Sequence, residues 1–158
     1  MKRLILKDGY SPKLDLLQTE IAIKYVKDTF EKDLAKELKL TRVSAPLFIL
    51  PSTGLNDNLN GYERRVSFDI KNINENVEVV QSLAKWKRNA LAKYNFAQNT
   101  GLYTDMNAIR RDEELDTLHS AYVDQWDWEK IISKEERNEE TLKRHVLKIF
   151  KVIKHMEH

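Results

Sequence analysis

The 158-residue sequence contains no cysteine, and it has only 4 glycines and 3 prolines. The lack of cysteine excludes disulfide frameworks, thiolate zinc sites, iron–sulfur clusters and cysteine nucleophiles. No apolar run approaches the roughly 20 residues that a membrane span needs. The basic N-terminus is followed by too short an apolar stretch for a signal peptide. We therefore expect a soluble, cytoplasmic protein that has no membrane partner.

An excess of one charge sign is also missing, because 27 Lys and Arg residues face 25 Asp and Glu residues, a formal net charge of +2. Such a balance makes nucleic acid an unlikely partner. Hydrophobic residues make up 41% of the chain, which is enough for a sizeable core, and the scarcity of glycine and proline argues against disorder. The length suits one domain, or one incomplete piece of a larger one.

The spacing of apolar residues predicts a mixture of helices and strands. A helix is expected over residues 11–40, with a start nearer Thr19 as the alternative, because Ile23, Val26, Phe30, Leu34 and Leu38 recur at helical steps. Further helices are expected over 83–94 and from 137 to the end, the last with the apolar stripe Leu142, Val146, Ile149 and Ile153. Strands are expected over 41–50, 62–70, 77–80, 102–109 and 118–128, with a loop over 51–61, a turn over 71–76 and a charged loop over 110–117. Short loops between adjacent strands predict the α+β class, an antiparallel sheet flanked by helices.

Two short polar segments are candidates for ligand binding, each with a plainer alternative. Asp57, between two asparagines in the loop, could orient an ammonium group, although a residue of this kind more often satisfies turn backbone. The cluster Lys85–Arg88, with Trp86 inside it, could hold a carboxylate or phosphate, or could be a solvated basic face. Its resemblance to a nucleic-acid patch is weak on a nearly neutral chain.

The predicted hairpin carries two more candidates. Arg110 stands at the mouth of its loop, where a guanidinium suits a pair of phosphate oxygens, and the acidic residues just after it could approach Mg²⁺; a solvated charged loop is the alternative. Alternation in the second strand places Val123, Gln125, Asp127 and Glu129 on one face and two tryptophans on the other. Burying amides and acids without partners is costly, so that face contacts water or a polar ligand, and we favour the ligand.

Several of these segments resemble one family. The segments QSLAKWKR (81–88), GLYTDMNAIR (101–110), LHSAYVDQWDWE (118–129) and DNLNG (57–61) are similar to the ammonia-dependent asparagine synthetase, aspartate–ammonia ligase, and the match runs from about Thr19 to the end. The family's core resembles that of class II aminoacyl-tRNA synthetases. The resemblance implies a homodimer whose substrates are aspartate, ammonia and ATP, with Mg²⁺. It also implies a β-aspartyl-adenylate that ammonia converts to asparagine, with release of pyrophosphate and AMP.

The resemblance also implies roles for individual residues. Arg110 would grip the α-phosphate and act as the catalytic residue, and Leu118 and Val123 would lie near the adenine. The aspartate pocket would comprise Asp57, Ser82, Lys87, Gln125 and Asp127. The first helix and the strand with Pro46 resemble the first class II motif, which builds the dimer interface, and the hairpin over 101–129 resembles the second.

The chain departs from the family in two respects. Gln81 stands where the family is expected to have His. The family chain is roughly twice as long, well above the ~150-residue expectation for one domain, and its other half holds the third motif with a second ATP-binding arginine. We therefore expect residues 1–158 to form a single partial catalytic domain with little or no activity alone. The alternative is a non-catalytic fragment that acts as a dimerisation or binding module.

Overall fold

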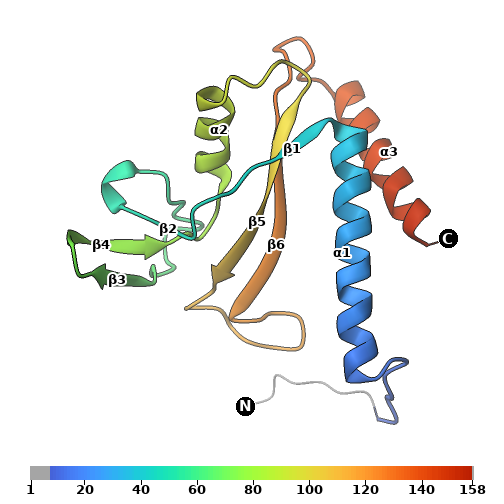
Figure 1. Cartoon of the computed structure of the whole chain (residues 1–158), viewed down its shortest axis with the longest axis horizontal. Helices are drawn as coiled ribbons and strands as arrows, with labels where there is room; N and C mark the ends of the chain where they lie inside the picture. The colour runs from blue at the N-terminus through green and yellow to red at the C-terminus, as the bar shows by residue number, and fades with distance from the viewer. Residues whose placement is uncertain (1–7, 158) are drawn as a thin grey trace. The chain divides into compact units, whose positions relative to one another are not determined.

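The computed structural model describes residues 8–157, which form helices and strands in the order shown in Figure 1. The helices are α1 (Leu16–Leu38), α2 (Ala84–Lys93) and α3 (Glu139–Met156), with a short 3₁₀ turn at Pro51–Thr53. The strands are β1 (Leu40–Arg42), β2 (Phe48–Ile49), β3 (Ser67–Ile70), β4 (Ile73–Val79), β5 (Gly101–Ile109) and β6 (Tyr122–Lys130). One sheet has the order β1-β5-β6 and the other β2-β4-β3.

The described residues divide into two compact units. The first unit comprises Val43–Asn95 and Tyr103–Glu129, and the second comprises residues 8–42, Phe96–Leu102 and residues 130–157. Among residues 8–157 no helix has the length and apolar character needed to cross a bilayer.

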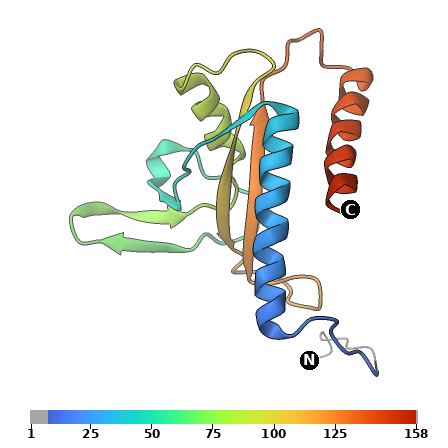
Figure 2. The ribbon, with the colours of Figure 1, turned by 45° about the vertical axis from the view of Figure 1, so that its right-hand side comes forward.

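The smaller sheet of the first unit is built around the β3–β4 hairpin, which Figure 2 shows as an extended ribbon. Phe68 pairs with Val77, and Ile70 pairs with Ile73, with an irregularity between the two pairs. On its other edge β4 pairs antiparallel with β2. An edge-to-face contact between Phe48 and Phe68, with ring centroids 5.3 Å apart, joins the two outer strands.

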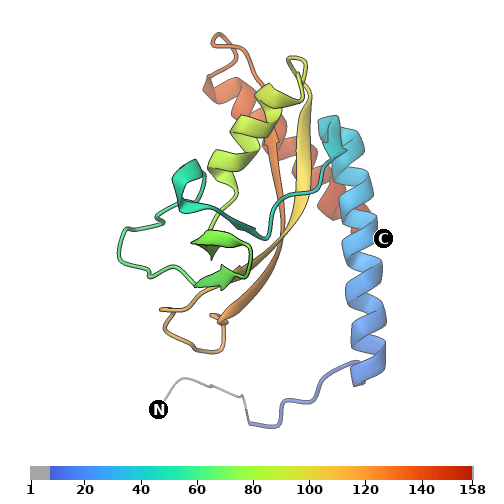
Figure 3. The same ribbon diagram turned by 60° about the vertical axis from the view of Figure 1, so that its left-hand side comes forward.

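The core of the first unit lies where α2 packs against β5 and β6 (Figure 3). Its buried residues are Val80, Leu83, Met106 and Ala108, and the partly buried Ala45, Ile49, Trp86 and Val123 pack against them. Residues from both ends of the β4–α2 connection therefore enter one apolar cluster. This packing fixes the connection that holds the candidate site.

The β5–β6 hairpin is closed at its loop end by a bond from the Arg110 backbone N–H to the Ala121 carbonyl, 2.7 Å. On one face Trp126 packs against Tyr103, with ring centroids 4.6 Å apart. The Asp116 carboxylate accepts the backbone N–H groups of Leu118 and His119, both at 2.7 Å. Because this turn occupies residues 116–119, the second strand begins at Tyr122, later than the predicted 118.

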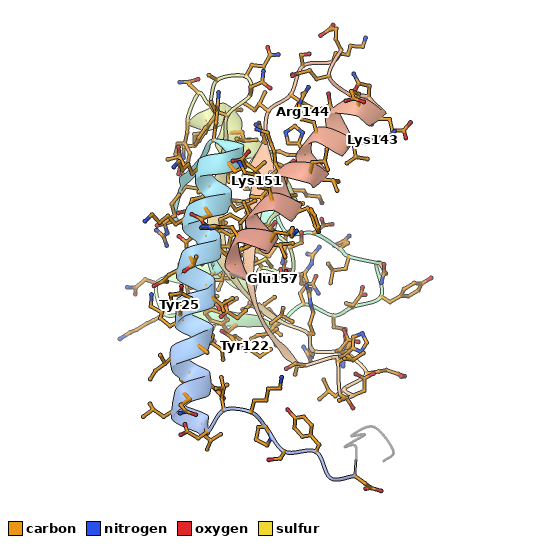
Figure 4. All side chains as sticks on the ribbon, turned by 90° about the vertical axis from the view of Figure 1, so that its right-hand side faces the viewer. Tyr25, Tyr122, Lys143, Arg144, Lys151 and Glu157 are labelled. Atoms are coloured by element: carbon orange, nitrogen blue, oxygen red, sulfur yellow. The ribbon has the colours of Figure 1, made fainter. Side chains whose placement is uncertain are left out.

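In the second unit α1 and α3 lie side by side and run in opposite directions (Figure 4). Lys148 Nζ donates to the Glu37 carbonyl at 3.2 Å. About two turns further along α3, His155 Nδ1 lies 2.9 Å from Asp33 Oδ2. Both helices start at capping side chains: Asp15 accepts the Gln18 N–H, and Asn138 accepts the Thr141 N–H. In the same unit the Gly101 N–H donates to the Lys39 carbonyl at 3.1 Å, beside β1.

The α+β class and all three predicted helices are confirmed. The start of α1 lies between the two predicted starts, because Asp15 and Gln18 form a reciprocal capping box. Two helix predictions need correction: Ile23 and Val26 are exposed on α1, and three of the four α3 stripe residues, Leu142, Val146 and Ile153, are exposed as well.

Besides the strand predicted from 118, three strand predictions were wrong in their bounds. The segment 41–50 is broken into β1 and β2, and Pro46, which cannot donate a backbone hydrogen bond, lies in the gap. The segment 62–70 is a strand only from Ser67. The turn predicted over 71–76 is limited to the residues between Ile70 and Ile73, because polar residues of an exposed hairpin extend β4 into that segment.

Candidate functional site

A pocket of about 430 Å³ opens in the first unit beside the end of β5. Its lining includes Gln81 and Arg110 together with polar residues of the hairpin loop and of the loop before β3: Asn60, Glu63, Arg111, Asp112 and Glu113. The pocket thus brings together segments that are far apart in the sequence. It presents groups of both charge signs to anything that enters it.

Arg110 is the best-placed cation of this pocket. It is half-buried, and its Nη1 donates to the Gln81 carbonyl at 2.9 Å. A guanidinium has five N–H donors in a planar fork, and within residues 8–157 no ion pair with Arg110 is present. One bond therefore orients the side chain and leaves most of its donors for an anion.

The acids around the pocket are engaged by neighbours. Asp112 accepts the Arg64 backbone N–H at 2.7 Å and the Arg64 Nε at 3.0 Å. These bonds lower the pKa of Asp112 from 3.8 to about 2. The Glu63 carboxylate accepts the Asn60 N–H at 3.1 Å, and hydrogen bonds from backbone N–H groups lower its pKa. At neutral pH both carboxylates are therefore ionised, and both are held by hydrogen bonds from neighbouring residues.

Asn56 connects the Asp57 loop to this pocket. It is 5% exposed, and its Nδ2 donates to the Val79 carbonyl at 3.2 Å, while its Oδ1 accepts the Gln81 N–H at 2.8 Å. The same Nδ2 lies 3.2 Å from Glu78 Oε2. Both ends of the amide are thus satisfied, which holds the loop against the β4–α2 connection.

A second charged centre surrounds Lys87 on α2. Lys87 is buried, and its Nζ lies 2.6 Å from Asp127 Oδ1, 3.0 Å from the Trp128 carbonyl and 3.6 Å from Glu129 Oε2. The alternation predicted for β6 is therefore confirmed for Asp127 and Glu129, which share the face toward α2. Glu129 also pairs with Arg88, whose Nε lies 4.0 Å from Glu129 Oε1. The partly exposed carboxylate of Asp127 could therefore hold the ammonium group of an amino acid.

The other residues predicted for the site lie apart from these contacts. Ser82 Oγ accepts the Ala84 N–H at 3.2 Å at the start of α2, and Gln125 and Asp57 are half-buried. Leu118 is 89% exposed in the hairpin loop, and Val123 packs on the apolar cluster. Nothing tests the roles of these residues, which stay predictions.

Sequence reasoning missed Gln81 and Asn56 as parts of the site. Gln81 is 4% exposed, and its Oε1 is buried without a hydrogen-bond partner among the described residues. Two signals were present in the sequence: Asn56 stands directly before Asp57, and Gln81, directly before Ser82, departs from the expected family residue.

The Mg²⁺ predicted from the sequence stays a prediction. Within residues 8–157, no group of three or more His, Cys, Asp or Glu side chains is placed to hold a metal ion. Near the pocket, Asp112 is already bound by Arg64. Mg²⁺ generally binds through one or two carboxylates, several waters and substrate phosphates, so it does not require a cluster of three protein ligands.

A family model described as aspartate–ammonia ligase matches residues 17–158. The chain belongs to the aspartate–ammonia ligase family. An aspartate–ammonia ligase of Ruminiclostridium cellulolyticum is 67% identical over 158 residues, which cover 99% of this chain and 47% of that protein. One from Clostridium tetani is 65% identical over 157 residues, which cover 99% and 46% of the two chains. The chain therefore spans about half the length of the curated ligases it matches.

Solved structures agree with the fold of this ligase family member. A pyrrolysyl-tRNA synthetase of Desulfitobacterium hafniense aligns with a TM-score of 0.57 at 13% identity, over 91% of this chain and 60% of that one. A histidyl-tRNA synthetase of a Nostoc species aligns with a TM-score of 0.56 at 12% identity, over 91% and 34%. The fold is thus that of class II aminoacyl-tRNA synthetases, as the resemblance implied.

Proposed function

We propose that the chain forms the aspartate- and α-phosphate-binding part of an ATP-dependent enzyme that makes asparagine. The aspartate side-chain carboxylate attacks the α-phosphorus of ATP, which gives β-aspartyl-adenylate and pyrophosphate. Ammonia then displaces AMP. Activation is needed because a carboxylate reacts poorly with ammonia, whereas a mixed anhydride carries a good leaving group.

Arg110 is the observation that carries this proposal. Its guanidinium lines the pocket, is oriented by the Gln81 carbonyl, and retains free donors. Negative charge builds on the α-phosphate while pyrophosphate leaves, and a preorganised guanidinium stabilises that charge without reorganising. The same contact holds the adenylate while ammonia attacks.

The Lys87 centre supplies the binding of aspartate. Asp127 and Glu129 keep carboxylate oxygens partly exposed, although Lys87 is buried beside them. The α-ammonium group of aspartate can pair with the exposed Asp127 oxygen. Lys87 fixes the position of that carboxylate and offsets part of its charge, so a free amino acid enters a site that is already ordered.

Binding of a stable sulfamoyl analogue of β-aspartyl-adenylate to the purified chain tests this proposal by calorimetry. Loss of a charge-assisted contact predicts that Arg110→Ala weakens binding by about 10- to 100-fold. Arg144→Ala, which removes the same charge from an exposed position on α3 in the second unit, is the matched control and should change binding little. Equal binding by wild type and Arg110→Ala would contradict the proposal.

Turnover is a separate question. Because the chain spans about half the length of the ligases it matches, we expect the 158-residue polypeptide alone to show little or no aspartate-dependent ATP–pyrophosphate exchange. Robust exchange by the purified chain would show that these residues suffice for adenylation. ATP, Mg²⁺ and ammonia are accordingly proposed as ligands of the complete enzyme.

A second candidate, a dimerisation module, is favoured by the exposed apolar residues of α1. Leu16, Leu17, Ile21, Ile23 and Val26 are all exposed, and such residues on one helix suit a homodimer interface. Sedimentation velocity tests this: Ile21→Glu should shift a dimer toward monomer, while Glu20→Lys, at an exposed neighbouring position, should not. A wild-type chain that remains monomeric would contradict the candidate.

A further inference from the structure

Gln81 is held rigidly at the wall of the pocket. Its backbone N–H donates to Asn56 Oδ1 at 2.8 Å, and its carbonyl accepts Arg110 Nη1 at 2.9 Å. Leu83, two residues further on, is completely buried in the apolar cluster. The backbone of Gln81 is thus fixed by three contacts, one of which is the hydrogen bond from Arg110.

The side-chain amide oxygen of Gln81 lacks a hydrogen-bond donor among the described residues. This oxygen, Oε1, is also buried. Buried polar atoms of native proteins almost always have partners, so an exception calls for an explanation. Gln81 lines the pocket, and rotation of the terminal amide is easy because its last torsion has a broad energy profile. A donor that enters the pocket can therefore satisfy this oxygen.

The chemistry of the site narrows the identity of that donor. The phosphate of an adenylate has acceptors but no donor for an amide oxygen, and the neighbouring carboxylates Glu63 and Asp112, which are ionised at neutral pH, have no donor either. Ammonia carries N–H donors and must approach the acyl carbon next to the phosphate. A neutral carbonyl suits it, because a carboxylate at this position would favour ammonium, which has no lone pair with which to attack.

We infer that Gln81 Oε1 accepts a hydrogen bond from the ammonia nucleophile and turns its lone pair toward the acyl carbon of the adenylate held by Arg110. This rests on the proposed function. The new C–N bond forms as the C–O bond to the α-phosphate breaks, and AMP departs with that electron pair. The nitrogen releases one proton to solvent water. Gln81 takes no proton, since an amide oxygen is too weak a base.

Two tetrahedral analogues of the attacked adenylate test this inference on the 158-residue chain. Both replace the acyl carbon by phosphorus; the phosphonamidate carries an amino group where ammonia adds, and the phosphinate carries a methyl group there. One neutral hydrogen bond predicts that wild type binds the amino analogue about 2- to 10-fold more tightly than the methyl analogue. In Gln81→Met the two affinities should become equal, with the methyl analogue bound as before.

The controls separate the possible failures. Gln98→Met makes the same chemical change in the second unit and should keep the wild-type ratio, and Gln81→His, which restores an acceptor, should recover part of it. Equal binding of both analogues by wild type would overturn the inference alone, whereas no binding of either would overturn the proposed function. If Gln81→Met fails to fold, the Gln81 side-chain ¹⁵N–¹H₂ resonance of wild type decides, because only the amino analogue should shift it strongly.

Discussion

Lys87 and Arg110 are two cations of the first unit that line or adjoin the candidate site, and their side chains are held in opposite ways. Lys87 is buried and surrounded by acceptors: Asp127, Glu129 and the Trp128 carbonyl. Arg110 is half-buried and makes one side-chain hydrogen bond, to the Gln81 carbonyl. The difference teaches that the ammonium group mainly orders strand β6, whereas the guanidinium is available to a ligand.

Replacing Lys87 should have the largest effect on stability. Lys87→Met leaves Asp127 without its cation beside the apolar cluster and leaves Glu129 with Arg88 alone, at 4.0 Å. Breaking a buried pair in this way typically costs ~3 kcal/mol, less where the carboxylates are partly exposed. Urea denaturation would measure the change in unfolding free energy. Lys85→Met is the matched control: Lys85 is exposed and makes one 3.3 Å bond to the Asn56 carbonyl. Similar losses of unfolding free energy in Lys87→Met and Lys85→Met would contradict the claim that Lys87 stabilises the first unit through its buried contacts.

Replacing Asn56 should lower the free energy of unfolding by less than replacing Lys87, and it should also disturb Arg110. Asn56→Ala removes the acceptor of the Gln81 N–H and the donor to the Val79 carbonyl. An unsatisfied buried group costs about 1–3 kcal/mol. Asn89→Ala, at an exposed position of α2, should change the unfolding free energy by less than ~0.5 kcal/mol. We expect Asn56→Ala also to weaken binding of the adenylate analogue, because Gln81 orients Arg110.

Replacing Arg110 should change stability less than replacing Lys87 or Asn56, by less than about 1 kcal/mol, because it is half-exposed and forms a single side-chain bond. Arg110→Ala should therefore separate stability from binding, because the same variant is expected to lose most of its affinity for the adenylate analogue. Thermal melts of Arg110→Ala and Arg88→Ala measured side by side provide the test. A loss as large as that of Lys87→Met would mean that Arg110 is structural.

The smallest predicted effect concerns the acid next to Arg110. The pKa of Asp112 is lowered to about 2 by hydrogen bonds from Arg64. Because the folded-state pKa is depressed, the contribution to stability is present above the ordinary value of 3.8 and is lost as the pH falls toward 2. A ¹³C titration of the Asp112 carboxylate measures this pKa directly. In Arg64→Gln it should return toward its ordinary value, and an unchanged pKa would contradict the assignment.

Features that depend on local periodicity could be predicted from the sequence. Two-residue alternation placed Asp127 and Glu129 together on β6, opposite Trp126, and the structure brings both toward Lys87. The α2 helix over Ala84–Lys93 followed from its residues in the same way. Such features could be predicted because each is decided by neighbours a few positions away.

Contacts between distant segments could not be predicted. The Arg110–Gln81 and Asn56–Gln81 bonds join residues 29 and 25 positions apart, and no spacing rule connects them. The start of β4 was missed for another reason. Its first residues, Ile73–Asn76, are all exposed, and all but Ile73 are polar. In an exposed hairpin the composition of a strand resembles that of a turn.

The position of the adenylate is the most direct test of this account. A crystal structure of the chain with the sulfamoyl analogue should place the sulfamoyl oxygens about 2.7–3.2 Å from the Arg110 guanidinium, with the α-ammonium group beside Asp127. An analogue bound elsewhere, with Arg110 still turned only toward the Gln81 carbonyl, would contradict the central claim that Arg110 and Asp127 together hold the activated aspartate.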